Sequence, residues 1–257
     1  MPGPTDRDEL AELLADAGFV AAAEEARELL DRAAGDAQLL EALVARRLTG
    51  EPLAWITGSV SFCGQEIGVD RGVYVPRWQS EALALRAVER LPANGVAVDV
   101  CTGAGAIAKT LMTRRPGARV VATDLDERAV ACARRNGVKA HRGDLLAPLP
   151  RALEGRIDVV IGVVPYVPTG DLRLLQRDTL TFESTVSYDG GDDGTALLRR
   201  VVADGPRFLR SGGALLLELG GRQADALEDD LARRRFVDLE VLRDEEGDVR
   251  GIEATLA

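Results

Sequence analysis

The chain has 257 residues, 46% of them hydrophobic, and a formal net charge of -10. This length suits one large domain or one domain with a small lobe, and the acidic balance argues against binding to the phosphates of duplex nucleic acid. The three cysteines (Cys63, Cys101 and Cys132) lack metal-ligand spacing, and the one histidine, His141, argues against a histidine-based metal site or a Ser-His-Asp triad. With an acidic N-terminus and no apolar run of about 18 residues, the sequence predicts a cytoplasmic protein without a membrane span.

Residues 1–49 are predicted to form a small helical lobe. Leucine and alanine recur at helical spacing from Asp6 to about Arg47, and Gly18 and Gly35 interrupt the pattern, which indicates three short helices. Such a lobe either caps the main domain or recognises a partner or substrate, and the sequence favours neither interpretation.

Residues 50–79 are predicted to form a hairpin linker between the lobe and the main domain. Short apolar runs separated by turn residues predict strands at residues 62–64, 67–69 and 73–75.

Residues 80–257 are predicted to form the main domain, in which strands and helices alternate. The predicted strands are Val96–Val100, Arg119–Thr123, Val138–Arg142, Ile157–Val163 and Ala214–Leu219, and the predicted helices are Glu81–Arg90, Ala106–Arg114, Glu127–Arg135 and Thr195–Phe208. This alternation predicts an α/β fold with a parallel sheet covered on both faces. Two last strands, Phe236–Arg243 and Gly251–Leu256, predict a C-terminal antiparallel hairpin, which is typical of the Rossmann-like class I methyltransferase sheet.

The segment Asp99–Gly105 predicts a nucleoside-cofactor site. It follows an apolar run and opens a predicted helix, and its small residues allow backbone N–H groups to approach a ligand closely. Asp124 ends the next predicted strand, where a carboxylate can accept both hydroxyls of a ribose. The spacing Gly103-x-Gly105 lacks the third glycine of the dinucleotide fingerprint, which favours S-adenosylmethionine over NAD. A plain tight turn is the alternative interpretation.

Further motifs follow in a fixed order along nearly the whole chain. They are Gly50–Gly58, Phe62-x-Gly64, Val75-Pro76-Arg77, Asp99–Ala108, Asp124, Gly143-Asp144-Leu145, Pro165–Thr169, Asp189–Gly194 and Gly212–Glu218. In this order they resemble the protein-glutamine N-methyltransferases that modify the Gly-Gly-Gln motif of class 1 peptide release factors. The resemblance implies S-adenosylmethionine as the cofactor and a release factor as the partner.

The resemblance also implies the roles of individual residues. It assigns the cofactor to Asp99, Cys101, Thr102, Gly103, Gly105, Asp124, Leu125, Asp144 and Leu145; the acceptor substrate to Arg77, Trp78, Glu81 and Glu183; and methyl transfer to Val163, Val164, Pro165 and Tyr166. Structural alternatives stand beside four of these roles. Asp99 would only hold its loop, Asp144 would cap a turn, Trp78 would fill the core, and Glu183 would be an exposed loop charge.

The chain departs from the family pattern where the chemistry is expected. The family's Asn-Pro-Pro-Tyr appears here as residues 163–166, Val-Val-Pro-Tyr. The family is thought to orient the substrate NH₂ with the asparagine side-chain oxygen and the next backbone carbonyl. Val163 has no such acceptor, although the Val164 carbonyl and Tyr166 remain. Losing one such hydrogen bond costs on the order of 2.7–4 kcal/mol, or about 10²–10³ in rate.

A second departure from the family pattern lies just before the main domain. The family's Pro-Arg-Pro-Glu-Thr-Glu appears as residues 76–81, Pro-Arg-Trp-Gln-Ser-Glu, in which Trp78 offers a stacking wall.

Three hypotheses for function follow from the sequence. The chain methylates a release factor, or it methylates nitrogen or oxygen of a small molecule in specialised metabolism, or it binds the cofactor without catalysis. The intact cofactor loop argues against the last hypothesis, and a more apolar pocket suits the second.

Overall fold

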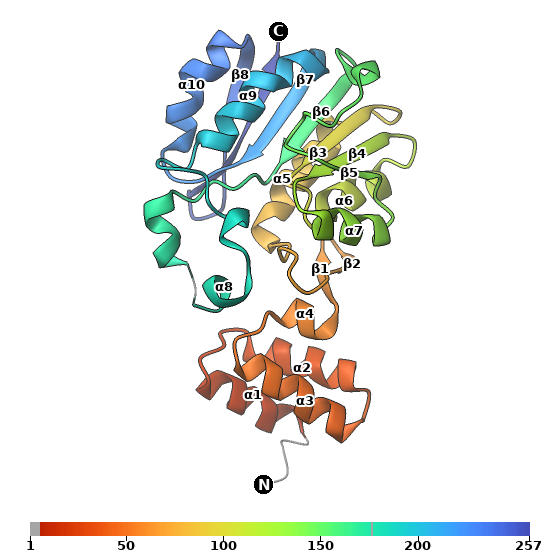
Figure 1. Cartoon of the computed structure of the whole chain (residues 1–257), viewed down its shortest axis with the longest axis vertical. Coiled ribbons are helices and arrows are strands. Elements are labelled where there is room, and N and C mark those ends of the chain that lie inside the picture. The colour runs from red at the N-terminus through yellow and green to blue at the C-terminus, as the bar shows by residue number, and fades with distance from the viewer. Residues whose placement is uncertain (1–5, 176) are drawn as a thin grey trace.

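The computed structural model describes residues 6–175 and 177–257, which include a seven-stranded sheet of order β5-β4-β3-β6-β7-β9-β8 (Figure 1). Its strands are β3 (Val96–Val100), β4 (Arg119–Asp124), β5 (Ala140–Arg142), β6 (Ile157–Gly162), β7 (Leu209–Glu218), β8 (Phe236–Arg243) and β9 (Val249–Leu256). Strands β3 to β7 are parallel to one another, whereas β9 is antiparallel to both β7 and β8. The predicted α/β sheet with a C-terminal antiparallel hairpin is confirmed.

Helices cover both faces of this sheet because its strands alternate apolar side chains between two cores. On one face lie α5 (Glu81–Arg90), α6 (Ala106–Arg114) and α7 (Glu127–Arg135), and on the other lie α9 (Ala196–Phe208) and α10 (Gln223–Arg233). In β3, Ala97 packs into the first core while Val98 and Val100 pack into the second. The predicted bounds of α5, α6 and α7 are confirmed, and α10 is a helix that the sequence analysis did not predict.

The N-terminal helices have a core of their own. Helices α1 (Arg7–Asp16), α2 (Ala22–Ala33) and α3 (Ala37–Leu48) enclose ten buried apolar residues, of which Ile56 comes from α4 (Leu53–Thr57). These helices lie at the opposite end of the molecule from the C-terminus (Figure 1). Arg47 joins them, since its guanidinium binds Glu25 through Nε at 2.5 Å and lies 3.8 Å from the centre of the Phe19 ring.

The segment between these helices and the sheet contains one hairpin, made of β1 (Ser59–Phe62) and β2 (Gln65–Gly68). Cys63 and Gly64 form its turn with φ of +50° and +73°, so the predicted strand at residues 62–64 is displaced. The predicted strand at 73–75 is wrong. Its backbone groups bind side chains instead of a neighbouring strand: the Val73 carbonyl accepts from Trp55 Nε1 at 2.9 Å, and Val75 N donates to Glu183 at 3.3 Å.

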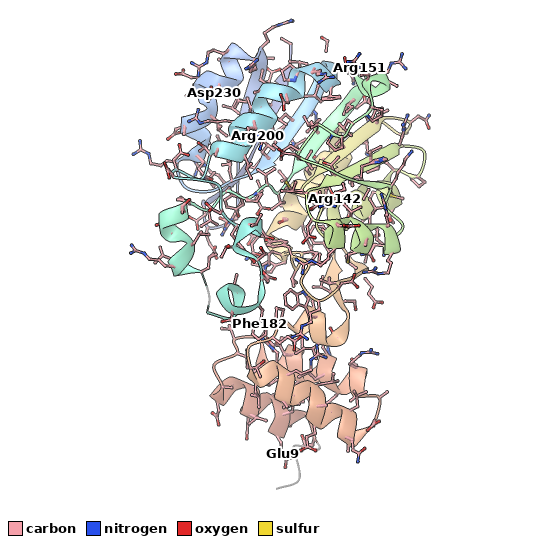
Figure 2. All side chains as sticks on the ribbon, in the orientation of Figure 1. Glu9, Arg142, Arg151, Phe182, Arg200 and Asp230 are labelled. Atoms are coloured by element: carbon pink, nitrogen blue, oxygen red, sulfur yellow. The ribbon has the colours of Figure 1, made fainter. Side chains whose placement is uncertain are left out.

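Short helical segments complete the chain. They are η1 (Trp78–Ser80), η2 (Arg151–Leu153), η3 (Thr169–Leu174), α8 (Arg177–Phe182) and η4 (Thr185–Ser187). Phe182, which Figure 2 labels at the end of α8, meets the Trp55 ring edge-on with 6.5 Å between ring centroids. No helix among the described residues is long and apolar enough to cross a membrane.

Candidate functional site

A cavity of about 550 Å³ opens at the carboxyl ends of β3, β4 and β6, and we call it the large cavity. Of the residues singled out in the sequence, it is lined by Cys101, Gly103, Asp124, Leu125, Asp144, Leu145, Val163 and Pro165. The strand order reverses between β3 and β6, and ligands of doubly wound sheets bind at such a point. The structure therefore brings eight of the seventeen predicted site residues together at this cavity.

The loop from β3 to α6 owes its shape to left-handed backbone at alternate residues. Cys101, Gly103 and Gly105 have φ of +57°, +55° and +86°. Gly103 N donates to Asp124 Oδ2 at 2.8 Å, which holds the loop against the end of β4. A Cβ at Gly105 would lie 3.0 Å from Val138 Cγ2, so Gly105 allows α6 to pack closely rather than facing the large cavity.

Asp99 lies beneath this loop, fully buried. Its Oδ2 accepts from Thr102 Oγ1 at 2.6 Å and from Ala108 N at 3.1 Å, so it holds the loop and the first turn of α6. Burial raises the pKa of Asp99 to about 7 because desolvation outweighs these hydrogen bonds. Asp99 and Thr102 also line a small cavity of about 40 Å³ beside the large one. A cationic ligand group there would favour the ionised carboxylate.

The far wall of the large cavity carries two acidic side chains and two leucines. Burial raises the pKa of Asp124, whose Oδ1 accepts from Asp126 N at 2.9 Å. Asp144 is half exposed and binds Arg200 of α9, which Figure 2 labels, at 2.5 Å. Leu125 is 59% exposed at the rim, whereas Leu145 is buried. This wall offers carboxylate acceptors beside apolar surface, which suits a ribose and a flat base.

The segment Val163–Tyr166 follows β6 directly and borders the large cavity. Val163 lines both the large and the small cavity, whereas the side chain of Val164 is fully buried in the core. Among the described residues, no donor binds the Val164 carbonyl. The Tyr166 hydroxyl donates to Glu218 Oε1 at the end of β7 at 2.9 Å. The segment therefore contains one buried backbone acceptor without a donor, next to two apolar residues, Val163 and Pro165, that line the large cavity.

All three tyrosines of the chain gather beside this segment. Tyr74 and Tyr188 lie with ring centroids 5.4 Å apart. Burial raises the pKa of Tyr74 and of Tyr166, and the nearby charge of Glu218 raises both further. Tyr188 also donates to the buried carboxylate of Glu183. We call Tyr74, Tyr166 and Tyr188 the tyrosine cluster. Sequence reasoning missed Tyr74, Tyr188 and the role of Glu218, and the scarcity of tyrosine was the one available signal.

Glu183 and Arg77 bind each other and the Tyr188 hydroxyl of the tyrosine cluster. Arg77 Nη2 donates to Glu183 Oε2 at 2.7 Å and to the Tyr188 hydroxyl at 3.0 Å. The side chain of Glu183 is 1% exposed, so its interpretation as an exposed loop charge is wrong. Arg77 lines the small cavity. Glu183 does not line it but holds the Arg77 side chain in place.

Two residues assigned to the acceptor substrate lie elsewhere. Trp78 is 74% exposed, which rules out core filling. It lines neither the large nor the small cavity. Glu81 accepts from Cys63 N at 2.9 Å and so ties the β1–β2 turn to α5. The predicted contact of Trp78 with a substrate therefore stays a prediction, and Glu81 has a structural role in this state.

A third cavity, of about 550 Å³, lies on the other side of Tyr166. Its walls come from the segment after Tyr166, including Leu174 and Leu175, and from the start of α10, including Gln223 and Ala226. Gln223 Nε2 donates to the Tyr166 carbonyl at 2.6 Å, which fixes the position of Tyr166 in the wall of the third cavity.

Comparison with known proteins adds three findings. A family model described as "Methyltransferase small domain" matches residues 79–161. The chain is 35% identical over 211 residues to a release factor glutamine methyltransferase of Geobacter sulfurreducens, covering 80% of this chain and 73% of that relative. It is also 35% identical over 191 residues to a 4-amino-L-phenylalanine/4-methylamino-L-phenylalanine methyltransferase of Streptomyces pristinaespiralis, covering 70% of this chain and 65% of that relative.

A solved structure shares the fold. A methyltransferase from Pyrococcus furiosus superposes with a TM-score of 0.55 at 18% identity, covering 82% of this chain and 96% of that one. At this level of identity the likeness concerns the architecture of the sheet and its helices, which places the large cavity where the fold predicts a ligand.

Proposed function

Because the chain belongs to the family of release factor glutamine methyltransferases, we propose that it transfers a methyl group from S-adenosylmethionine to a nitrogen atom. The first candidate acceptor is the side-chain amide of the glutamine in the Gly-Gly-Gln motif of a class 1 release factor. The observation that carries this proposal is that Val163 and Pro165 line the large cavity, and that the Val164 carbonyl between them accepts no hydrogen bond among the described residues.

The large cavity supports the cofactor part of the proposal. Asp124 would accept the ribose hydroxyls, Leu125 and Leu145 would enclose the base, and Asp144 would accept from the base's amino group. The first turn of α6 lines the small cavity through Ala106 and Ile107, and a helix N-terminus suits the carboxylate of the methionine part. When bound, the cofactor supplies an electrophilic methyl group on a sulfonium centre.

The acceptor segment supports the choice of nitrogen. An amide nitrogen is a weak nucleophile because its lone pair is delocalised, so catalysis depends on orientation and on stabilising developing positive charge. The Val164 carbonyl can accept one N–H of the acceptor and direct the nitrogen toward the large cavity. Val163 leaves the second N–H without its partner, so we expect a slow amide reaction.

The proposal is tested by methyl transfer from labelled S-adenosylmethionine to a purified class 1 release factor. Mass spectrometry of the Gly-Gly-Gln peptide locates the methyl group. We expect one methyl group on the glutamine amide. Calorimetric titration with the cofactor in the same preparation is the control, and binding without any methylated peptide would contradict the release factor as acceptor.

A small amine is the second candidate acceptor, and Val163 is the observation that favours it. An apolar side chain at this position suits an aromatic amine, which needs no pair of amide-orienting acceptors. The relative from Streptomyces pristinaespiralis is named for methylation of an amino group on a phenylalanine ring. With 4-amino-L-phenylalanine as the probe, methyl transfer to the amine and none to the release factor would assign this acceptor class.

A further inference from the structure

Glu218 is a buried carboxyl group at the carboxyl end of β7 that the proposed function leaves unexplained. It is 7% exposed, and its Oε1 accepts from the Tyr166 hydroxyl at 2.9 Å. Its Oε2 has no partner with normal hydrogen-bond geometry among the described residues, and the Ser80 side chain is close enough to the carboxyl group to lower its pKa by a weaker hydrogen bond. A buried acceptor atom without a partner destabilises a fold by about 1–3 kcal/mol, which points to a role in function.

Methylation of a nitrogen atom requires a group that accepts the proton which the nitrogen loses. When the nitrogen lone pair bonds to the methyl carbon, the carbon–sulfur bond breaks, sulfur keeps its electron pair, and nitrogen becomes positively charged. The nitrogen then loses a proton to reach the neutral methylated product. No histidine lines the three cavities described, so a carboxylate is the ordinary acceptor available.

Three buried carboxylates surround the site, and their partners distinguish them. Glu183 is saturated by Arg77, Val75 N and Tyr188, which hold its negative charge in place. Asp99 is bound to the cofactor loop and the first turn of α6. Of these three, Glu218 is the one that binds the acceptor segment, through Tyr166.

We propose that Glu218, acting through the Tyr166 hydroxyl, takes up the proton that the acceptor nitrogen loses on methylation. The nitrogen's proton passes to Tyr166 Oη while the hydroxyl proton of Tyr166 passes to Glu218 Oε1, so no charge remains on the tyrosine. Tyr166 follows Pro165, which lines the large cavity, and in this proposal it meets the acceptor, with Glu218 as the positioning residue behind it. This inference rests on the proposed transfer to nitrogen.

The surroundings of Glu218 suit this role. Burial raises its pKa above the ordinary range, which makes the carboxylate a stronger base. The titratable and charged groups that face it are Tyr166 after β6, Tyr74 before η1, and Arg250 on β9. Arg250 is engaged by Asp244 at 2.6 Å, so its charge does not neutralise Glu218 directly.

The experiment compares Glu218→Gln and Tyr166→Phe with the unmodified chain. Glutamine keeps the size of the side chain and an oxygen that accepts from Tyr166, but it cannot take a proton. Glu253→Gln is the matched control, because Glu253 is also a buried glutamate (3% exposed) on β9, bound to Arg86 and Arg90 away from the cavities. Single-turnover methyl transfer is measured from pH 5 to pH 9 with the acceptor that the unmodified chain uses, and cofactor binding is measured by calorimetry.

We expect Glu218→Gln to slow methyl transfer about 10²–10⁴-fold with unchanged cofactor affinity and acceptor KM. The fall in rate at low pH, where Glu218 is protonated, should disappear in this variant and in Tyr166→Phe. The double variant should be no slower than the slower single variant. Equal rates and pH profiles in Glu218→Gln and the unmodified chain would overturn the inference, as would an equal loss in Glu253→Gln.

A second readout needs no substrate and separates the two proposals. Infrared difference spectra between low and neutral pH should contain a protonated-carboxyl band that is absent in Glu218→Gln and shifted in Tyr166→Phe. An unshifted band in Tyr166→Phe would overturn the proton path while leaving methyl transfer standing. If the band shifts as expected but the chain methylates no nitrogen acceptor, the proposed function fails and the inference that rests on it falls too.

Discussion

At the scale of single residues, we propose that position 163 decides how well an acceptor amide is oriented. Val163 lines the large and small cavities with carbon alone, next to the buried Val164. An asparagine there would add the missing hydrogen-bond acceptor. We expect Val163→Asn to raise the rate of glutamine methylation about 10²–10³-fold, because one well-placed hydrogen bond is worth this much in such sites.

The Val163→Asn prediction is checked by initial rates with the release factor. Val163→Leu serves as the matched control, since it keeps the apolar character and should not raise the rate. If the release factor is a substrate and the asparagine variant is no faster, then the assignment of this position to amide orientation is wrong.

Asp99 makes the stability of the fold depend on pH. Its pKa rises from 3.8 to about 7 on folding because burial disfavours the charge. Between these values the folded chain holds a proton that the unfolded chain has lost. The contribution of Asp99 is therefore fully present below about pH 4 and is lost as pH rises through 7, by up to about 4 kcal/mol.

The Asp99 prediction is checked by urea unfolding at several pH values between 4 and 8. Asp99→Asn keeps an oxygen that accepts from Thr102 Oγ1 and Ala108 N. The free energy of unfolding of this variant, relative to the unmodified chain, should improve as pH rises. A constant difference across this range would show that Asp99 titrates alike in both states.

At the scale of elements, Gly105 permits the packing of α6 against α7. A Cβ there would meet Ala133 Cβ at 3.1 Å and Val138 Cγ2 at 3.0 Å, with φ of +86°. We expect Gly105→Ala to lower the free energy of unfolding by about 2 kcal/mol or more, from backbone strain plus overpacking.

Gly137 offers the control for this prediction. Its φ is +85°, but nothing lies within 4 Å of a Cβ there, so Gly137→Ala measures the backbone strain alone. Chemical unfolding of both variants gives the packing contribution as their difference. Equal losses of stability would mean that the close approach of α6 and α7 is relieved without cost.

The segment from Val73 to Arg77 shows how elements outside the sheet shape the site. It is extended but pairs with no strand, and Glu183 binds both its Val75 N and its Arg77 side chain. This arrangement places Tyr74 against Tyr188, so two loops about 110 residues apart in sequence lie side by side. Tyr74 and Arg77 of the first loop line the small cavity.

At the scale of the whole molecule, Arg47 and Glu25 join the N-terminal helices. Their side chains are 8% and 12% exposed, so removal of one charge leaves the other buried and uncompensated. We propose that residues 1–49 form a separate lobe, and we expect Glu25→Gln to destabilise it by about 3 kcal/mol. Hydrogen exchange should then rise in α1–α3 and stay unchanged in β3 and β6.

An exposed ion pair provides the control for the Glu25→Gln prediction. Glu127 lies 3.1 Å from Arg142 with both side chains more than half exposed, so Glu127→Gln should change stability by less than about 1 kcal/mol. A uniform rise of exchange over the sheet and the helices in Glu25→Gln would contradict a lobe that opens separately.

Local sequence patterns determined the elements of this protein and the chemistry of one wall of its site. Helical spacing and strand-forming runs are properties of neighbouring residues, so α5, α6 and α7, the parallel strands and the turn Gly103–Gly105 follow from the sequence alone. The same is true of Val163, whose side chain lacks a hydrogen-bonding group wherever it lies.

Only the tertiary structure decided which distant residues meet. Tyr74, Tyr166 and Tyr188 come from three separate segments, and Glu218 comes from the end of β7. Burial of Glu183, exposure of Trp78 and the missing strand at 73–75 follow from long-range packing, in which side chains and strands compete for the same backbone partners. Because periodicity carries no information about such partners, the fold was predictable from the sequence, whereas the polar wall of the acceptor site was not.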